Sequence, residues 1–145
     1  MREEDRHFFE RMALINFEPL LARVIQSNET WTRQRATSAL RWYKRFLFLA
    51  YKYPNRRLAV LKDVDELWHL HILNTRQYFS DCEGLFGRYL HHTPLSDTEG
   101  TSSDLLEETS QLYAKHFGKR PDGSSKIARC GGNCSKCSND FEIAA

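Results

Sequence analysis

The sequence predicts an all-α protein: a single bundle of four to five helices with a flexible Gly/Cys-rich C-terminal tail. Apolar residues recur at helical spacing through most of the chain and show no convincing alternating strand pattern. Residues that begin or end helices separate these apolar patterns. A chain of 145 residues is the size of one domain. We therefore expect a helical domain over residues 1–120 and a flexible Cys-rich tail over residues 121–145.

The first half of the chain predicts two amphipathic helices. Residues Glu4 to Ser27 carry their apolar side chains near one side and predict the first helix. Asn28 or Thr30 can cap a second helix, which we expect from about Trp31 to Tyr53 and which Pro54 ends. The core stripe of this second helix consists of Ala39, Tyr43, Phe46, Leu47 and Ala50.

The second half predicts two longer helices with a shorter piece between them. Asp63 can cap a helix that runs to roughly Phe79. The glycines of CEGLFGRYLHH mark a shorter helical piece or turn. After the polar loop TPLSDTEGTSS, Ser103 or Asp104 opens a last helix that Gly118 ends.

Composition and charge exclude several classes of protein. The net charge of +2 argues against a dedicated nucleic-acid binder, so the basic residues of RWYKRF and PNRR indicate a solvated helix face and its exit loop. The start MREEDRHFFERM lacks the apolar core of a signal peptide, and the run FLFLAY is too short to cross a bilayer. We expect a cytoplasmic protein with reduced thiols that does not bind membranes.

The segment VDELWHLHILNTRQYFSDCEGLFGRYLHH concentrates four histidines and one cysteine. Residues advance about 100° each around a helix axis, so Asp65 and His69 lie one turn apart on the same side. His69 and His71 lie about 200° apart and cannot bind one ion from a regular helix. We therefore predict that His71 is a core histidine that donates to a buried carbonyl or carboxylate. Asp65 and His69 form either a metal-binding pair or a plain hydrogen bond.

A metal site needs further ligands, and the chain reversal after this helix offers them. One of His91 and His92 is expected to face inward and the other to face solvent. We predict a site of Asp65, His69 and His92, which Cys82 or His71 completes. Mixed N/O ligands suit Zn, Fe, Mn or Cu, and a cysteine favours Zn or Cu. Three protein ligands would leave one position open for water or substrate.

The tail sequence ARCGGNCSKCSND contains a second group of candidate ligands, Cys130, Cys134 and Cys137. Their C-x3-C-x2-C spacing is that of radical SAM enzymes, but a helical chain before it and few residues after it exclude that class. The three thiolates can bind Zn with His116 or another chain as fourth ligand, or can bind Cu(I). Alternatively, the tail is a mobile thiol-bearing arm.

The sequence resembles the glycine-rich domain-containing protein-like family, as a short bacterial-type member. The stretches RWYKRFLFLAYKYP, VDELWHLHILNTRQYFSDCEGLFGRYLHHTP and TSQLYAKHFG carry this resemblance, which covers roughly Ala39 to Gly118. It implies an all-helical domain and supplies no mechanism. The loop TPLSDTEGTSSD departs from the aromatic and Gly-rich run of the family. The family pattern falls on Asp65, Trp68, His69, His71, Tyr78, Asp81, Cys82, Gly87 and His92.

These patterns predict a small soluble helical protein with a transition-metal site of Asp and His and no assigned activity. The alternative is a non-catalytic module that binds a protein partner or carries metal on its cysteine tail. A third interpretation is a structural domain whose histidines form buried hydrogen bonds. The sequence contains no nucleophile elbow, phosphate loop or dinucleotide fingerprint, which leaves hydrolase, kinase and dehydrogenase classes without support.

Overall fold

The computed structural model describes residues 1–93, 102–122, 126–127 and 141–142, and in these ranges most of the chain is helical. This confirms the all-α class, with six helices in place of the four to five predicted. Two short strands, β1 (Lys126–Ile127) and β2 (Phe141–Glu142), pair antiparallel, which the sequence did not indicate. The helices are α1 (Glu3–Ala13), α2 (Glu18–Ser27), α3 (Arg33–Lys52), α4 (Lys62–Leu73), α5 (Thr75–Phe86) and α6 (Ser102–Phe117).

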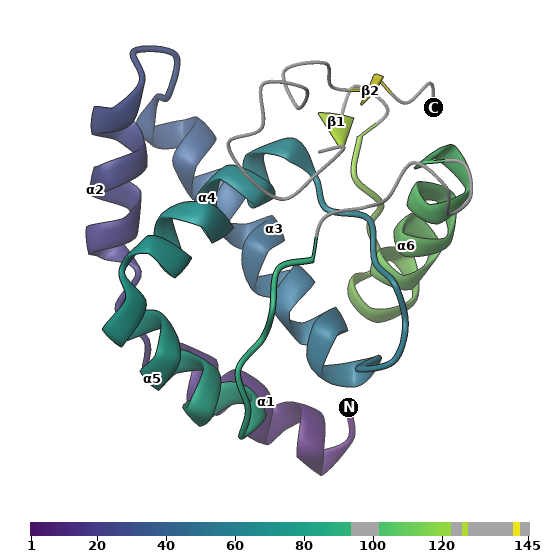
Figure 1. The fold of residues 1–145 in the computed structure, drawn as a ribbon. Coiled ribbons are helices and arrows are strands. Elements are labelled where there is room, and N and C mark those ends of the chain that lie inside the picture. Colours follow the sequence, from purple (N-terminus) through teal and green to yellow (C-terminus); the bar gives the residue numbers. More distant parts are fainter. Residues whose placement is uncertain (94–101, 123–125, 128–140, 143–145) are drawn as a thin grey trace.

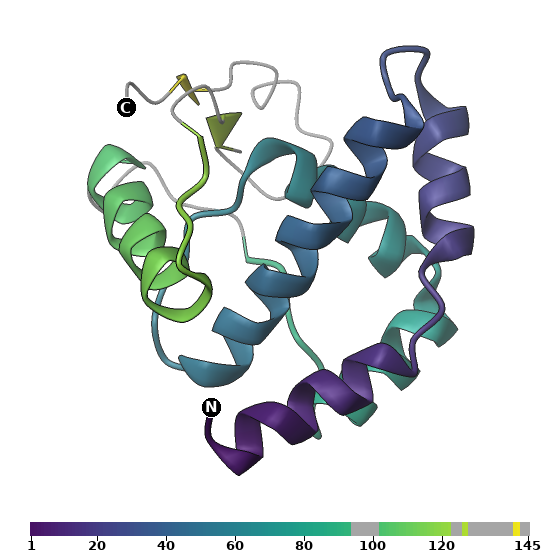
Figure 2. The ribbon, with the colours of Figure 1, turned by 180° about the vertical axis from the view of Figure 1, so that it is seen from behind.

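The long helix α3 runs through the middle of the molecule, and the other helices pack around it. Helices α2 and α6 lie on opposite sides of α3 in both views (Figures 1 and 2). Helix α4 packs against α2, α3 and α5. Helix α5 in turn lies against α1 (Figure 1). Helix α4 is therefore surrounded by three helices, which explains why most of its side chains are buried or half-buried.

The helix predicted over Glu4 to Ser27 is two helices, and the residues of the break explain why. Helix α1 ends at Ala13, and the side-chain oxygen of Asn16 accepts a hydrogen bond from the backbone N–H of Glu18 at 3.1 Å. Pro19 follows in the first turn of α2, where its missing N–H costs nothing. An Asx turn and a proline together start a new helix.

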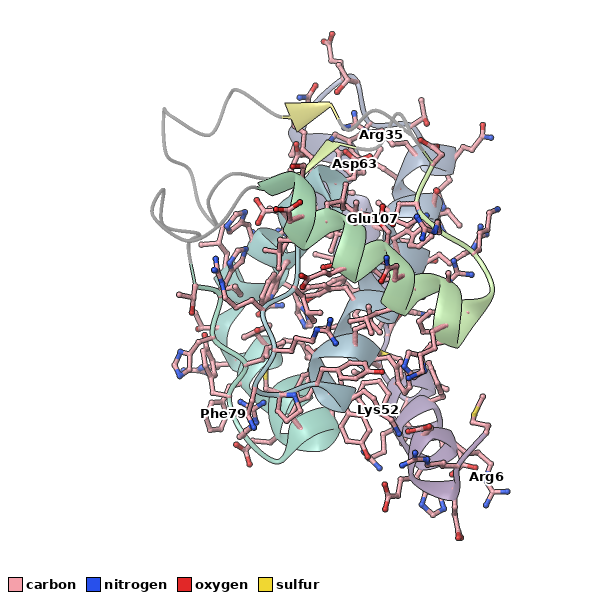
Figure 3. All side chains as sticks on the ribbon, turned by 90° about the vertical axis from the view of Figure 1, so that its right-hand side faces the viewer. Arg6, Arg35, Lys52, Asp63, Phe79 and Glu107 are labelled. Carbon is pink, nitrogen blue, oxygen red and sulfur yellow. The ribbon has the colours of Figure 1, made fainter. Side chains whose placement is uncertain are left out.

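The helix caps differ from those predicted. The hydroxyl of Thr32 accepts from the backbone N–H of Arg35 at 3.1 Å and caps α3, whereas Asn28 accepts from Thr30 in the preceding turn. Asp63 lies inside the first turn of α4 and does not cap it. Its carboxylate pairs with Arg35 at 2.7 Å, and Figure 3 shows the two side chains at the same end of the bundle. The side chain of Asp63 thus ties α4 to α3.

The predicted helix from Asp63 to Phe79 also breaks. Asn74, with φ −83° and ψ 73°, separates α4 from α5. Helix α5 then continues to Phe86 and ends at Gly87, whose φ of 67° is one that favours glycine. Gly118, with φ 68°, ends α6 as predicted. The break at Asn74 lets α5 turn away from α4 toward α1.

The core is rich in aromatic side chains, and every residue of the predicted core stripe on α3 is buried. Lys52 of α3 reaches Asp5 of α1 at 2.8 Å in a largely buried ion pair (Figure 3). The fully buried aromatic side chains are Phe8, Tyr43, Tyr78 and Tyr113.

No helix among the described residues is long and apolar enough to cross a bilayer.

Candidate metal centre

Helix α4 supplies an acid and an imidazole one turn apart. Asp65 is 7% exposed, and its Oδ2 lies 3.2 Å from Nδ1 of His69. The spacing of four residues places both side chains on the same face of the helix. The side chain of His69 is 26% exposed, so this end of the pair remains accessible from solvent.

The chain reversal after α5 brings a second imidazole to the same carboxylate. Nε2 of His92 lies 2.6 Å from Oδ1 of Asp65, although the two residues are 27 positions apart. The His92 ring is nearly parallel to that of His69, at 7° and 4.8 Å between centroids. Its side chain is 8% exposed, whereas the neighbouring His91 is exposed, as the predicted alternation requires. The structure thus brings Asp65, His69 and His92 together, and these three residues are called the metal group below.

Three hydrogen-bonding groups fix the segment that carries His92. The indole N–H of Trp68 donates to the hydroxyl of Tyr78 at 2.9 Å, and that hydroxyl donates to the carbonyl of Leu90 at 2.5 Å. The Trp68 ring also stacks on the His92 ring, with centroids 3.8 Å apart and planes at 16°. The position of His92 is therefore set by buried aromatic side chains as well as by Asp65.

One nitrogen of each imidazole has no partner among the described residues. Asp65 contacts Nδ1 of His69 and Nε2 of His92, which leaves His69 Nε2 and His92 Nδ1 buried and without a hydrogen bond. A buried polar atom without a partner costs about 1–3 kcal/mol, and such atoms are rare in folded proteins. These bare nitrogens are the outer ones of the two rings, because the inner nitrogens face Asp65.

The spacing of the three side chains fits a single metal ion. One ligand atom from each of Asp65, His69 and His92 lies within 4.8 Å of the others. Ligands bonded at about 2.0–2.2 Å in a tetrahedral site lie roughly 3.3–3.6 Å from each other. The observed contacts of 2.6 and 3.2 Å are shorter, so the carboxylate would have to move away from the two nitrogens by up to about 1 Å to admit an ion.

His71 lies in a separate, fully paired cluster in the core. Its Nε2 donates to Oδ2 of Asp81 at 2.7 Å, and its Nδ1 accepts from the hydroxyl of Tyr43 at 2.8 Å. Gln77 donates to the other oxygen of Asp81 at 2.8 Å. Burial lowers the pKa of His71, although the hydrogen bond to Asp81 opposes this, and a neutral ring satisfies both contacts. The structure therefore does not bring His71 to the metal group.

Cys82 also lies apart from the metal group. It is 2% exposed, and its thiol is hydrogen-bonded to Tyr78 and to the backbone of Leu90. Burial raises the pKa of the thiol, which disfavours the thiolate that a metal would need. The three tail cysteines, Cys130, Cys134 and Cys137, lie outside the described residues.

Sequence reasoning missed two partners in this region. Tyr43 was expected only in the core stripe, and its hydrogen bond to His71 joins residues 28 positions apart. Trp68 was expected to pack in the core, and the structure confirms this. Its stacking on the His92 ring was not predicted. No local spacing signals either contact, since both depend on how the helices cross.

Comparison with known proteins places the chain in a family without adding a function. No curated protein and no solved structure matches it. A family model matches residues 7–105, a range that begins within α1, ends in the first turn of α6 and includes Asp65, His69 and His92. This range is more than half of the chain. The protein therefore belongs to the UCP032817-like family.

Proposed function

We propose that this protein binds one transition-metal ion through Asp65, His69 and His92 and keeps a coordination position open for a substrate or water. Two imidazoles and one carboxylate are the donor set of hydrolytic zinc centres and of non-haem iron(II) centres. Three protein ligands are one fewer than a closed structural zinc site has. The proposed class is therefore a metalloprotein with a reactive site.

The convergence of Asp65, His69 and His92, with one donor atom of each within 4.8 Å of the others, carries this proposal. A purely structural Asp–His cluster satisfies all its polar atoms, as the cluster around His71 does. In the metal group one carboxylate serves two imidazoles, and each ring retains a bare nitrogen. An ion bound to the two nitrogens that face Asp65 would bring both imidazoles and the carboxylate together as ligands, and each ring would then carry its proton on the outer nitrogen.

The surroundings of the site define what the chain itself contributes. When bound, the ion would act as a Lewis acid that polarises a substrate or lowers the pKa of a water. The Trp68 ring covers one face of the His92 ring and excludes water there. The partial exposure of His69 leaves an approach from solvent. The open position is therefore expected on the His69 side of the group.

Metal titration of the full chain tests the proposal. All measurements use a variant with the substitutions Cys130→Ser, Cys134→Ser and Cys137→Ser, called the serine background, so that the tail thiols cannot bind the metal. We expect one equivalent of Zn²⁺ or Fe²⁺ to bind by calorimetry. His69→Ala and His92→Ala should each weaken this binding roughly 100-fold. His7→Ala, which alters an exposed histidine on α1, should leave it unchanged.

Two outcomes would contradict the proposal. One is the absence of stoichiometric binding to the serine background, and the other is equal binding by the His92→Ala variant. Circular dichroism establishes that each variant is folded, and His69→Gln provides a milder change at a partly exposed position. Metal analysis of the protein as purified then identifies which ion it carries.

A further inference from the structure

A cavity of about 460 Å³ lies next to the metal group. Its walls come from the second half of α3, the link between α3 and α4, and the segment after α5. In Figure 1 this link and this segment both pass the lower half of α3. The cavity belongs neither to the metal group nor to the cluster around His71.

The lining of this cavity combines an apolar floor with a cationic rim. Three arginines line it, and no aspartate or glutamate does so among the described residues. Arg56 approaches Glu108 at 3.8 Å, but both side chains are about half-exposed, so this pair is loosely held. The apolar lining includes Phe46, Ala50, Leu58, Val60, Trp68 and Leu90, and the cationic lining is Arg56, Arg57 and Arg88.

Trp68 connects the cavity with the metal group. Its ring lines the cavity, lies 4.9 Å from the ring of Phe46, and stacks on the His92 ring at 3.8 Å. A molecule in the cavity would therefore touch the same indole that covers a proposed metal ligand. The segment that carries His92 contributes Leu90 and Thr93 to the cavity on either side of that histidine.

We propose that this cavity binds a small organic anion, with an apolar body on the floor and a carboxylate or phosphate group among the arginines. A guanidinium group donates two parallel hydrogen bonds to either anion, and such charge-assisted bonds are stronger than neutral ones. Mostly apolar pockets with a few polar anchors are typical of small-molecule sites. The proposal goes beyond metal binding and does not require the ion.

Binding of three matched naphthalene compounds to the metal-free full chain tests the proposal. The variant with serine at the three tail cysteine positions is titrated separately with 1-naphthoate, 1-naphthyl phosphate and the neutral 1-naphthalenemethanol. The buffer contains EDTA, which removes metal ions. We expect one anion to bind at one site, at least tenfold more tightly than the alcohol, and the preferred anion identifies the carboxylate or phosphate. Arg88→Gln should weaken the binding of that anion about tenfold, whereas Arg76→Gln, at an exposed arginine of α5 outside the cavity, should not.

The outcomes separate this proposal from the metal site. Because EDTA is present, a protein that fails to bind metal can still bind the anion, and the reverse also holds. Equal affinity for the alcohol and the anions would overturn the proposal, as would equal losses in Arg88→Gln and Arg76→Gln. The absence of saturable binding up to about 10 mM would overturn it too.

Discussion

Two Asp–His clusters depend on the same helix, and they differ in how completely their polar atoms are paired. His71 donates to Asp81, accepts from Tyr43, and has no polar atom without a partner. His69 and His92 share the carboxylate of Asp65 and each keep one bare nitrogen. Histidines two residues apart in α4 therefore differ in their surroundings, because His71 is fully paired in the core and His69 belongs to a group positioned to hold a metal ion.

The pairing of a histidine's second nitrogen distinguishes a structural imidazole from a candidate ligand better than its burial does. His71 and His92 have nearly the same side-chain exposure, at 7% and 8%. Both lie within 3 Å of a carboxylate oxygen, at 2.7 and 2.6 Å. The difference is that Tyr43 occupies the other nitrogen of His71, and no described residue occupies that of His92. Hydrogen-bond pairing thus separates a structural imidazole from a candidate ligand.

The largest expected effect is on metal affinity when Asp65 is changed. Asp65→Ala removes the carboxylate that both imidazoles face and should weaken Zn²⁺ binding on the order of 1,000-fold in a calorimetric titration. Asp81→Ala removes a carboxylate from the paired cluster and should leave Zn²⁺ affinity within about twofold. Equal losses in the two variants would mean that the clusters do not differ in metal binding.

For the free energy of unfolding, a change in the cluster around His71 should have a larger effect than a change in the metal group. Asp81→Ala leaves the buried Nε2–H of His71 without its acceptor and also removes the acceptor of the Gln77 amide, which lies nearer the surface. The free energy of unfolding of the metal-free protein should fall by about 3 kcal/mol, as measured by urea denaturation. His69→Ala, at a partly exposed position, should cost under about 1 kcal/mol. A larger loss for His69→Ala would contradict the assigned roles.

The pH dependence of stability should carry the signature of His71. Its pKa in the folded state is lowered, chiefly by burial, so the unfolded chain binds a proton more readily. The stability contribution is fully present above the ordinary pKa of about 6.5 and is lost as the pH falls from there toward the lowered value. Urea denaturation between pH 5 and 8, roughly the range in which histidine titrates, should show this slope in the wild type. A slope that is unchanged in His71→Gln would assign the effect to other groups.

The smallest expected effect concerns Trp68. Trp68→Phe keeps an aromatic ring beside His92 but removes the N–H that donates to Tyr78. Loss of one hydrogen bond of about 1 kcal/mol, if it is felt fully at the site, weakens Zn²⁺ binding about fivefold. A loss as large as that in Asp65→Ala would indicate that Trp68 does more than position His92.

The sequence predicted that Asp65, His69 and His92 come together, and the structure confirms this proximity. The spacing of Asp65 and His69 is fixed by the helix, and the reversal near Gly87 allowed His92 to return. The incompatibility of His69 and His71 as ligands of one ion follows from the same geometry. The likeness to the glycine-rich domain-containing family stays a prediction.

What could not be predicted depends on side chains that are distant in sequence. The breaks at Asn16 and Asn74 arise where short local turns compete with a continuous amphipathic pattern. The arginines of PNRR were interpreted as an exit loop, and their place in a cavity depends on how the segment after α5 returns to α3. Such contacts follow from packing, which hydrophobic periodicity does not encode.

Anomalous diffraction from crystals of the full chain grown with one equivalent of Zn²⁺ tests the central claim most directly. The account predicts one strong peak about 2.0–2.2 Å from an oxygen of Asp65 and from one nitrogen each of His69 and His92. A peak at His71 and Asp81, or a peak at the tail cysteines with none at Asp65, would contradict it.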